Sequence, residues 1–493
     1  MLIKMRLSNA WDAYGTMLLE RLFTAVLLGR FLFPFFYNPL DRIATDMQRH
    51  FNNGINLFTP NFFNGLDPKT YQVWLYLLHL FPSGLYHFFY AFFTGLLCAG
   101  MPWFWYKALR EITTRRKSLL LAIIIGTHLS LLVIYSLFMI ETMMLTIVAL
   151  SAWMTLRAVR KRTFAAFMAA TVCWIAAAFT KQTILPMMMM GMGYALLGQP
   201  DKLKAFAAAC ALFLLAIIPA SWQSYEALHF FAPFGFAGKE TIIRKCGYLE
   251  VGFTLGNNKN GYGVYYWRGT AFDYNPLTPV ASYTAKRISN QRYITGNIDL
   301  TQGRSGWEKA LYVVEQKHTW MDVLHEYEEN VVYLFFDHSW PDSNPGLPSL
   351  WLNLNFDLRW TWFPCFMLLL FYGPFARLAP HKMWIVMVAI AITWAFLLQD
   401  VAVVEGRYRK LIEPFMIAGV FFILESWWAP VPEKRVSLWE FITQIYVYPL
   451  LRQLLAPIFP TGEMDPLLEP LKVPAAPKAS LWSRVKEIAK ALE

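Results

Sequence analysis

The chain has 493 residues, of which 56% are hydrophobic, 17% aromatic and only 16% charged. Soluble globular domains carry about 25% charged residues, so this composition excludes an ordinary soluble enzyme and predicts a protein embedded in lipid. The net charge of +11 does not indicate nucleic-acid binding, because many basic residues lie in short loops between apolar runs and form no aromatic-interleaved stripe.

Apolar runs long enough to approach a bilayer span recur along the chain, so we expect an all-α polytopic bundle of about ten transmembrane helices. The first run is interpreted as a retained span, because no small-residue cleavage site follows it. The expected spans are residues 17–37, 83–106, 118–139, 142–157, 163–180, 183–198, 205–223, 361–377, 383–399 and 412–428.

The loops between these runs predict the orientation. Basic residues follow the second, fourth, sixth and eighth spans, which places them all on the side of the N-terminus. The positive-inside rule makes that side cytoplasmic, and an even number of spans then makes the C-terminus cytoplasmic too.

Four domains are expected. The insert at 224–360 is Gly- and Asn-rich at first, then helical, and is predicted to be a mixed α+β extracytoplasmic domain. The others are an N-terminal transmembrane module (1–223) with a first outer loop at 38–82, C-terminal transmembrane helices (361–429) with an outer loop at 399–412, and a cytoplasmic tail (430–493) with an interfacial and a basic amphipathic helix.

The first outer loop contains an acid, a guanidinium and an imidazole within about one helical turn: Asp46, Arg49 and His50. Such a set at a membrane surface can transfer protons and bind anions. The alternative is an ordinary polar loop between two spans.

Two further charges are expected on the same outer face. Lys181 ends the fifth span, where positive charge is against the usual trend; a snorkelling lysine is the alternative interpretation. Glu141 opens the fourth span, where a carboxylate could simply cap the helix N-terminus.

The last outer loop places three cations within a few residues, Arg407, Arg409 and Lys410. Guanidinium groups bind phosphate through two parallel hydrogen bonds, and a lysine adds a point charge. Contact with anionic lipid headgroups would explain the same cluster. Its coincidence with Asp46 on one face favours a substrate phosphate. No Cys or His spacing in the chain suggests a metal site.

Together these stretches resemble the GT-C superfamily of integral-membrane glycosyltransferases, which includes protein O-mannosyltransferases, the lipid A aminoarabinose transferase and arabinofuranosyltransferases. The likeness covers most of residues 10–428 as a pattern of spans. Its motifs are TDMQRH at Asp46, FTKQT at 179–183, FTLGNN at 253–258 and EGRYRKLIEP at 405–414.

The resemblance implies an inverting transfer of sugar from a polyprenyl-phosphate donor to a glycan, lipid or protein acceptor, on the outer face of a bacterial inner membrane. Asp46 would be the general base. Arg407, Arg409, Lys181 and Tyr408 would hold the donor phosphate, with Arg49, His50, Glu141, Asn257, Asn258 and Glu405 in support.

The chain departs from the family pattern at two places. Met47 follows Asp46 where many members have a second acid, so neither a metal nor any other cofactor is predicted. Lys410 and Leu411 stand where a proline is expected. A transporter or flippase of a lipid-linked sugar and a non-catalytic envelope-assembly protein remain alternative functions.

Overall fold

The structure is a computed structural model. It describes residues 2–41, 43, 46–58, 67–228, 254–255, 264–265, 331–336, 344, 346–397, 406–428 and 436–443. The chain divides into two compact units. Unit 1 comprises Met1–Pro364 with Ala391–Pro414, and unit 2 comprises Cys365–Ile390 with Phe415–Glu493.

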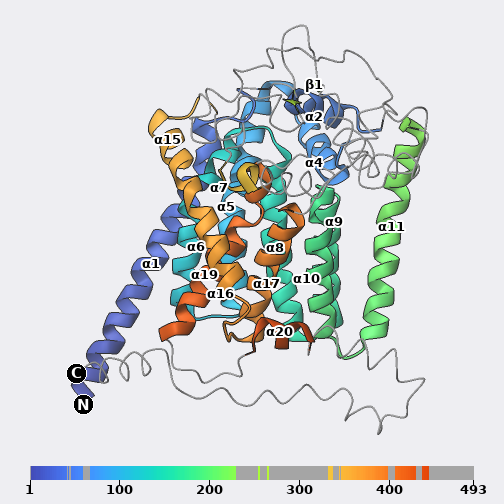
Figure 1. The fold of residues 1–493 in the computed structure, drawn as a ribbon. Coiled ribbons are helices and arrows are strands. Elements are labelled where there is room, and N and C mark those ends of the chain that lie inside the picture. The colour runs from blue at the N-terminus through green and yellow to red at the C-terminus, as the bar shows by residue number, and fades with distance from the viewer. Residues whose placement is uncertain are drawn as a thin grey trace, which may run out of the picture. The chain divides into compact units, whose positions relative to one another are not determined.

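Helices make up most of the described chain (Figure 1). From the N-terminus they are α1 (Leu2–Phe36), α2 (Asp46–Ile55), α4 (Lys69–His79), η1 (Ser83–Leu85), α5 (Tyr86–Arg110), α6 (Arg115–Thr127), α7 (Ser130–Val133), η2 (Ile134–Ser136), α8 (Ile140–Lys161), α9 (Phe164–Ala178), η3 (Gln182–Ile184), α10 (Leu185–Leu197) and α11 (Lys202–Leu228). After the gap come η6 (Val332–Phe336), α15 (Ser349–Leu358), η8 (Arg359–Thr361), α16 (Trp362–Tyr372), α17 (Pro380–Leu397), α18 (Gly406–Arg409), α19 (Glu413–Trp428) and α20 (Leu438–Phe441).

The predicted all-α membrane bundle is confirmed in outline, but the count of about ten spans is not. Each expected apolar run contains a helix, yet only four helices in the described part are long and apolar enough to cross a bilayer: Ser83–Arg110, Ile140–Lys161, Lys202–Glu226 and Pro380–Leu397. A fifth is counted if α6 and the segment Ser130–Ser136 form one span bent by 66°.

Length and charge explain the difference. Helix α9 has 15 residues and α16 only 11, which at 1.5 Å per residue falls short of a hydrocarbon core of about 30 Å. Helix α1 is long enough at 35 residues, but it carries Glu20, Arg21 and Arg30 within its apolar stretch.

In unit 1, α5 packs along α1, α6 and α8, and α9 packs along α8, α10 and α11. Small residues allow close approach: a side chain at Gly95 of α5 would collide with the backbone carbonyl of Phe31 in α1. Alanines form much of the core where α8, α9, α10 and α11 meet, in a cluster of Ala158, Phe167, Ala170, Ala195, Ala205 and Ala209. In a bilayer, such packing holds helices together without a hydrophobic driving force.

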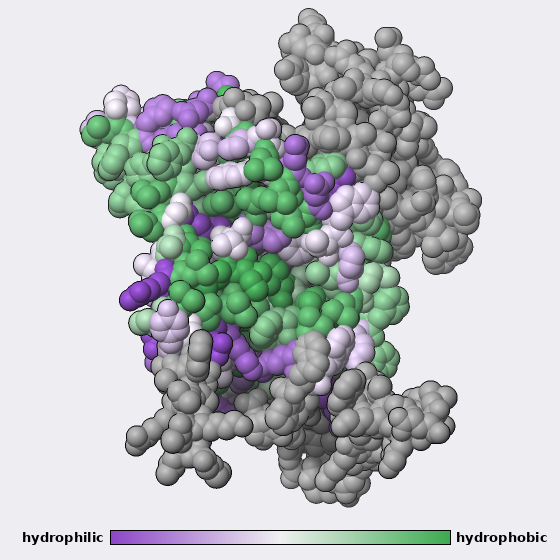
Figure 2. All heavy atoms as spheres, turned by 90° about the vertical axis from the view of Figure 1, so that its left-hand side faces the viewer, coloured by the Kyte–Doolittle hydropathy of each residue, from purple (hydrophilic) through white to green (hydrophobic). Residues whose placement is uncertain are grey.

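The two ends of these helices differ in chemistry. The basic turns gather at one end, where Arg160 at the end of α8 donates to Glu111 after α5 at 3.0 Å, and Lys204 of α11 lies over the ring of Phe164 at the start of α9. Helices α2 and α4 lie across the opposite end (Figure 1). Apolar side chains cross the middle of one face of the molecule, with polar ones above and below (Figure 2). This pattern indicates a lipid bilayer environment.

Strands are rare in the described residues. Within the expected insert 224–360, β1 (Thr254–Leu255) pairs antiparallel with β2 (Val264–Tyr265), Thr254 opposite Tyr265. The predicted α+β character of the insert is therefore limited, in the part described, to this short pair. The predicted amphipathic helix near the C-terminus lies outside the described residues. In unit 2, a single backbone bridge joins Leu378 to Val436.

Candidate functional site

Helix α2 directs three side chains at one buried carboxylate, Asp67, which lies just before α4. Arg49 donates from Nε to Oδ1 of Asp67 at 3.0 Å, and Asn53 donates from Nδ2 to Oδ2. The Nδ1 atom of His50 lies 3.5 Å from the same Oδ2. The Asp67 side chain is 2% exposed and Arg49 is 32% exposed, so the carboxylate joins α2 to α4 from the protein interior. We call Arg49, His50, Asn53 and Asp67 the Asp67 cluster.

The cluster keeps this carboxylate ionised. Burial alone would raise the pKa of Asp67, but His50, the charge of Arg49 and the amide of Asn53 together outweigh it and hold the pKa below its usual 3.8. Asp67 is therefore an anion at neutral pH, and its charge-assisted hydrogen bonds fix the orientation of α2.

Asp46, the predicted general base, is the first residue of α2, and its side chain lies outside the described part of the chain. Arg49, His50 and Asn53 of the same helix lie against Asp67. The predicted supporting residues Arg49 and His50 are thus brought together, around an acid that the sequence did not single out.

A second ion pair joins the start of α8 to the segment after α9. The Nζ atom of Lys181 lies 2.8 Å from Oε1 of Glu141, whose side chain is 2% exposed. The same ammonium lies 4.2 Å from the centre of the Tyr408 ring, and that ring stacks on Phe396. Three residues predicted from separate stretches therefore meet: Glu141, Lys181 and Tyr408. A cation over an aromatic face gains electrostatic stabilisation without losing its charge.

Contacts of Thr70 and Tyr71 place this pair at the same end of unit 1 as the Asp67 cluster. The backbone N–H of Thr70 donates to the carbonyl of Phe179 at 3.2 Å, two residues before Lys181. The ring of Tyr71 meets that of His50 edge to face at 5.5 Å. Burial raises the pKa of Tyr71, and the neighbouring Tyr90, Glu141 and Asp67 raise it further, so Tyr71 lies as a neutral group near both buried acids.

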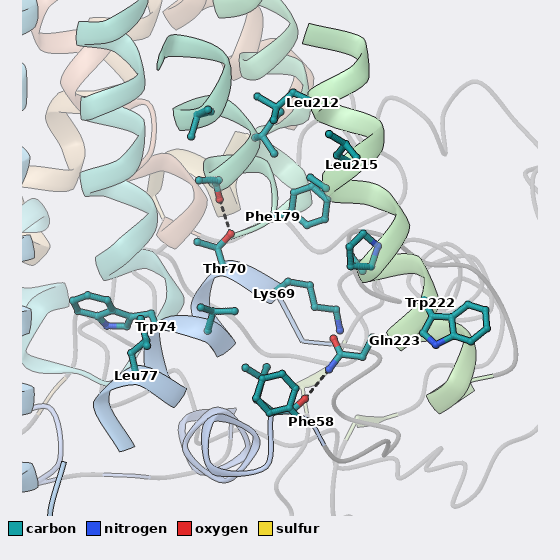
Figure 3. Close-up of a pocket in the computed structure, with 18 of the residues that line it drawn as sticks. Phe58, Lys69, Thr70, Trp74, Leu77, Phe179, Leu212, Leu215, Trp222 and Gln223 are labelled. Atoms are coloured by element: carbon teal, nitrogen blue, oxygen red, sulfur yellow. Dashed lines mark hydrogen bonds between the residues drawn. The ribbon is translucent and has the colours of Figure 1, made fainter. Parts of the chain in front are cut away.

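An apolar pocket of about 920 Å³ lies between α4, α9 and α11 (Figure 3). Its walls include Trp74 and Leu77 of α4, Phe179 after α9, and Leu212 and Leu215 of α11. Helix α11 exposes further large apolar side chains, Leu214, Ile218 and Trp222 among them. The pocket thus lies against a helix surface of the kind that faces lipid, and it suits an apolar chain.

Lys69, the first residue of α4, supplies a cation to this pocket. Its side chain extends toward Gln223 of α11, which donates to the carbonyl of Leu57 at 2.8 Å (Figure 3). Glu226 also lines the pocket. Burial lowers the pKa of Lys69 to about 8, although the nearby Asp67 raises it in part. Lys69 is therefore mostly a cation at pH 7 and loses its charge in mild base.

Arg409 and Lys410 turn inward. Arg409 donates from Nε to Oε1 of Glu413 at 2.9 Å, and from Nη1 to the carbonyls of Leu334 and Phe335 at 2.7 and 3.1 Å. Lys410 is fully buried and donates to Ser130, 2.7 Å to its carbonyl and 3.0 Å to its hydroxyl. The predicted phosphate contact of Arg409 therefore competes with bonds that this side chain already makes inside unit 1.

The remaining predicted site residues lie beyond what the structure describes. This applies to the side chain of Arg407 and to the whole of Asn257, Asn258 and Glu405. Among the residues described, no three His, Cys, Asp or Glu side chains come together in the way that would hold a metal ion.

Arg30, in the middle of α1, is a buried charge that the sequence interpretation passed over. It donates to the carbonyls of Cys98, Gly126 and Leu131 at 2.7, 2.8 and 2.8 Å. Each of these carbonyls lies where its own helix supplies no backbone N–H to donate to it. Pro102, four residues after Cys98, has no N–H, while Gly126 and Leu131 lie in the last turns of α6 and α7. Arg30 thus stabilises the break between α6 and α7.

Signals for the overlooked residues were present in the sequence. An arginine within an apolar run is costly in lipid, so Arg30 needed internal partners. Asp67 and Lys69 flank Pro68 just before a mostly apolar helical stretch, which is where charged groups gather at a helix start.

Comparison with known proteins identifies no relative. The chain matches no protein-family description, no curated protein and no solved structure.

Proposed function

We propose that this protein is an inverting glycosyltransferase that moves a sugar from a polyprenyl-phosphate donor to a glycan, lipid or protein acceptor. One observation carries the proposal: an apolar pocket of about 920 Å³ receives a half-buried lysine, Lys69, two residues from the Asp67 cluster. A polyprenyl phosphate has the matching shape, a long apolar chain ending in an anion. A soluble sugar nucleotide would need no such pocket.

The donor lies with its chain between α4, α9 and α11 and its phosphate toward Lys69. Lys181, with its ammonium over the Tyr408 ring, lies at the same end of unit 1 and is a second cation for the phosphate. Arg407 is a third cation for the phosphate. It belongs to the outer loop for which the sequence predicted this role. Cations that hold the phosphate stabilise the charge that develops on it as it leaves.

Asp46 is the general base. The acceptor hydroxyl gives its proton to the Asp46 carboxylate while its oxygen forms a bond to the anomeric carbon. The bond from that carbon to the phosphate oxygen breaks, and its electron pair leaves with the polyprenyl phosphate. A single displacement inverts the anomeric centre. The Asp67 cluster orients α2, and so the helix end where Asp46 stands.

The proposed setting is a bacterial inner membrane with both termini cytoplasmic and the Asp67 cluster on the opposite face. The gathering of basic turns at the far end of α8 from Glu141 supports that orientation. The short apolar helices α9 and Gln182–Leu197 complete the bundle within the bilayer.

Glycosyl transfer by purified protein in liposomes, with a polyprenyl-phosphate sugar as donor and Asp46→Asn as the variant, tests the proposal. Asn keeps the shape and removes the base, so the rate should fall by about 10²–10⁴-fold while donor binding persists. Asp41→Asn is the control, because Asp41 is an exposed acid in the same loop, 58% exposed at its side chain, and should have no effect. If Asp46→Asn transfers sugar at the wild-type rate, Asp46 is not the general base. Donor movement across the liposome without transfer would favour a flippase.

A further inference from the structure

The break between α6 and α7 leaves one serine at the centre of a buried polar network. Ser130 is the first residue of α7, which lasts four residues, and the chain bends by 66° around this break. Its hydroxyl donates to Oε1 of Glu413 at 3.0 Å and accepts from Nζ of Lys410 at 3.0 Å. Its carbonyl accepts from the same ammonium at 2.7 Å.

Glu413 completes the network, because its Oε1 also accepts from Arg409 at 2.9 Å. Ser130 is 3% exposed, Arg409 2%, and Lys410 and Glu413 are fully buried. Buried charges keep their geometry only when hydrogen bonds satisfy them, so each member of this network depends on the others.

The network determines where Tyr408 lies. Helix α18 has only four residues, too few to hold its own position. The residue before Arg409 is Tyr408, whose ring lies 4.2 Å from the Lys181 ammonium. Bonds from Arg409 and Lys410 to Glu413 and Ser130 therefore hold the ring against Lys181.

We propose that Ser130 is a positioning residue for the phosphate-binding part of the site, and that Arg409 and Lys410 act through this network and do not contact the donor. The proposal rests on the proposed function for its substrate. It assigns the phosphate contacts to Lys69, Lys181 and Arg407, so that Arg407 binds the donor while Arg409 and Lys410 position the site.

The other side of α7 supports this assignment. The carbonyl of Leu131, next to Ser130, accepts from Arg30 of α1 at 2.8 Å. Two adjacent residues of α7 thus connect the buried Arg30 to the segment that carries Tyr408. Because α7 is hydrogen-bonded on both sides, it holds the segment that carries Tyr408 in a fixed position relative to α1.

Hydrogen exchange of the full-length protein in nanodiscs, together with the dissociation constant for polyprenyl monophosphate, tests the proposal. In Ser130→Ala, amides of 406–414 should exchange about tenfold faster, and the phosphate should bind several-fold more weakly. Exchange in α5 and α8 should not change. Ser130→Thr keeps the hydroxyl and should restore both readouts.

Ser151→Ala is the matched control, because Ser151 is a buried serine whose hydroxyl donates to the carbonyl of Ile147 in its own helix, at 2.8 Å. It should leave both readouts unchanged. Unchanged exchange of 406–414 in Ser130→Ala, or equal acceleration throughout α5 and α8, overturns the proposal. Faster exchange with unaltered affinity refutes the positioning role alone, whereas wild-type protein that binds no polyprenyl monophosphate refutes the proposed donor.

Discussion

Lys181 and Glu141 lie forty positions apart in the chain, and their charged atoms lie 2.8 Å apart. Each opens or follows a different helix of unit 1, so the pair fixes the start of α8 against the end of α9. The ammonium also lies 4.2 Å from the centre of the Tyr408 ring, so the ion pair joins three segments of unit 1.

Removing one member of this pair should destabilise the protein strongly. Glu141→Leu leaves the Lys181 ammonium without its buried carboxylate, and we expect a loss of about 3–5 kcal/mol in the free energy of unfolding. Combining it with Lys181→Met should cost less than the sum of the two single changes, because no charge is then left buried. Thermal unfolding in detergent measures both.

The control is the pair of Arg160 and Glu111, whose charged atoms lie 3.0 Å apart and in which the arginine side chain is 63% exposed. Glu111→Ala should cost less than about 1 kcal/mol. Strictly additive effects of the Lys181 and Glu141 substitutions would show that the two residues do not interact.

Lys69 should make phosphate binding depend on pH. Its pKa of about 8 means that the amine is charged below pH 8 and neutral above it. The dissociation constant for polyprenyl monophosphate should therefore rise as the pH is raised from 7 to 9. Lys69→Met should bind about tenfold more weakly at pH 7 and lose this dependence.

Lys69→Arg separates charge from titration, since a guanidinium stays protonated throughout this range. Its affinity should stay level from pH 7 to 9. A wild-type affinity that does not change between these pH values would contradict the placement of the phosphate at Lys69.

The residue types of the site could be predicted from the sequence better than their partners. Arg49, His50, Glu141 and Lys181 were singled out because ionisable residues next to apolar runs are conspicuous, and Tyr408 because it lies between two arginines of the 405–414 motif. Their partners were not predictable in the same way. Arg49 pairs with Asp67, an acid eighteen residues later in the chain. Neither residue spacing nor hydrophobic periodicity predicts that these two residues lie together.

The membrane helices show a similar limit. Hydropathy located each helical run, since apolar composition is a local property. It overestimated how many are long enough to span, because helix ends are set by local breaks such as the bend near Ser130. The inward direction of Lys410 was equally hidden, since a cation in a polar loop is expected to face water or a ligand.

Asp67 should make the stability of the protein depend on acid pH. Its pKa in the folded protein lies below the usual 3.8, so its contribution is fully present above pH 3.8 and disappears as the pH falls through the lowered value. Asp67→Asn should therefore unfold at a lower temperature than wild type at pH 7, with the difference shrinking below pH 4. A difference that stays constant down to pH 3 would contradict the cluster.

Arg30 offers the sharpest test of the α6–α7 break. Arg30→Met leaves the carbonyls of Cys98, Gly126 and Leu131 without their side-chain donor, and we expect a loss of about 3 kcal/mol or more in the free energy of unfolding. Arg21→Met, an exposed position of the same helix, should have little effect. Adding Pro102→Ala to Arg30→Met returns an N–H four residues after Cys98 and should recover part of the loss. Thermal unfolding of the four proteins decides this: if the double variant is no more stable than Arg30→Met, the Cys98 carbonyl is not what Arg30 serves.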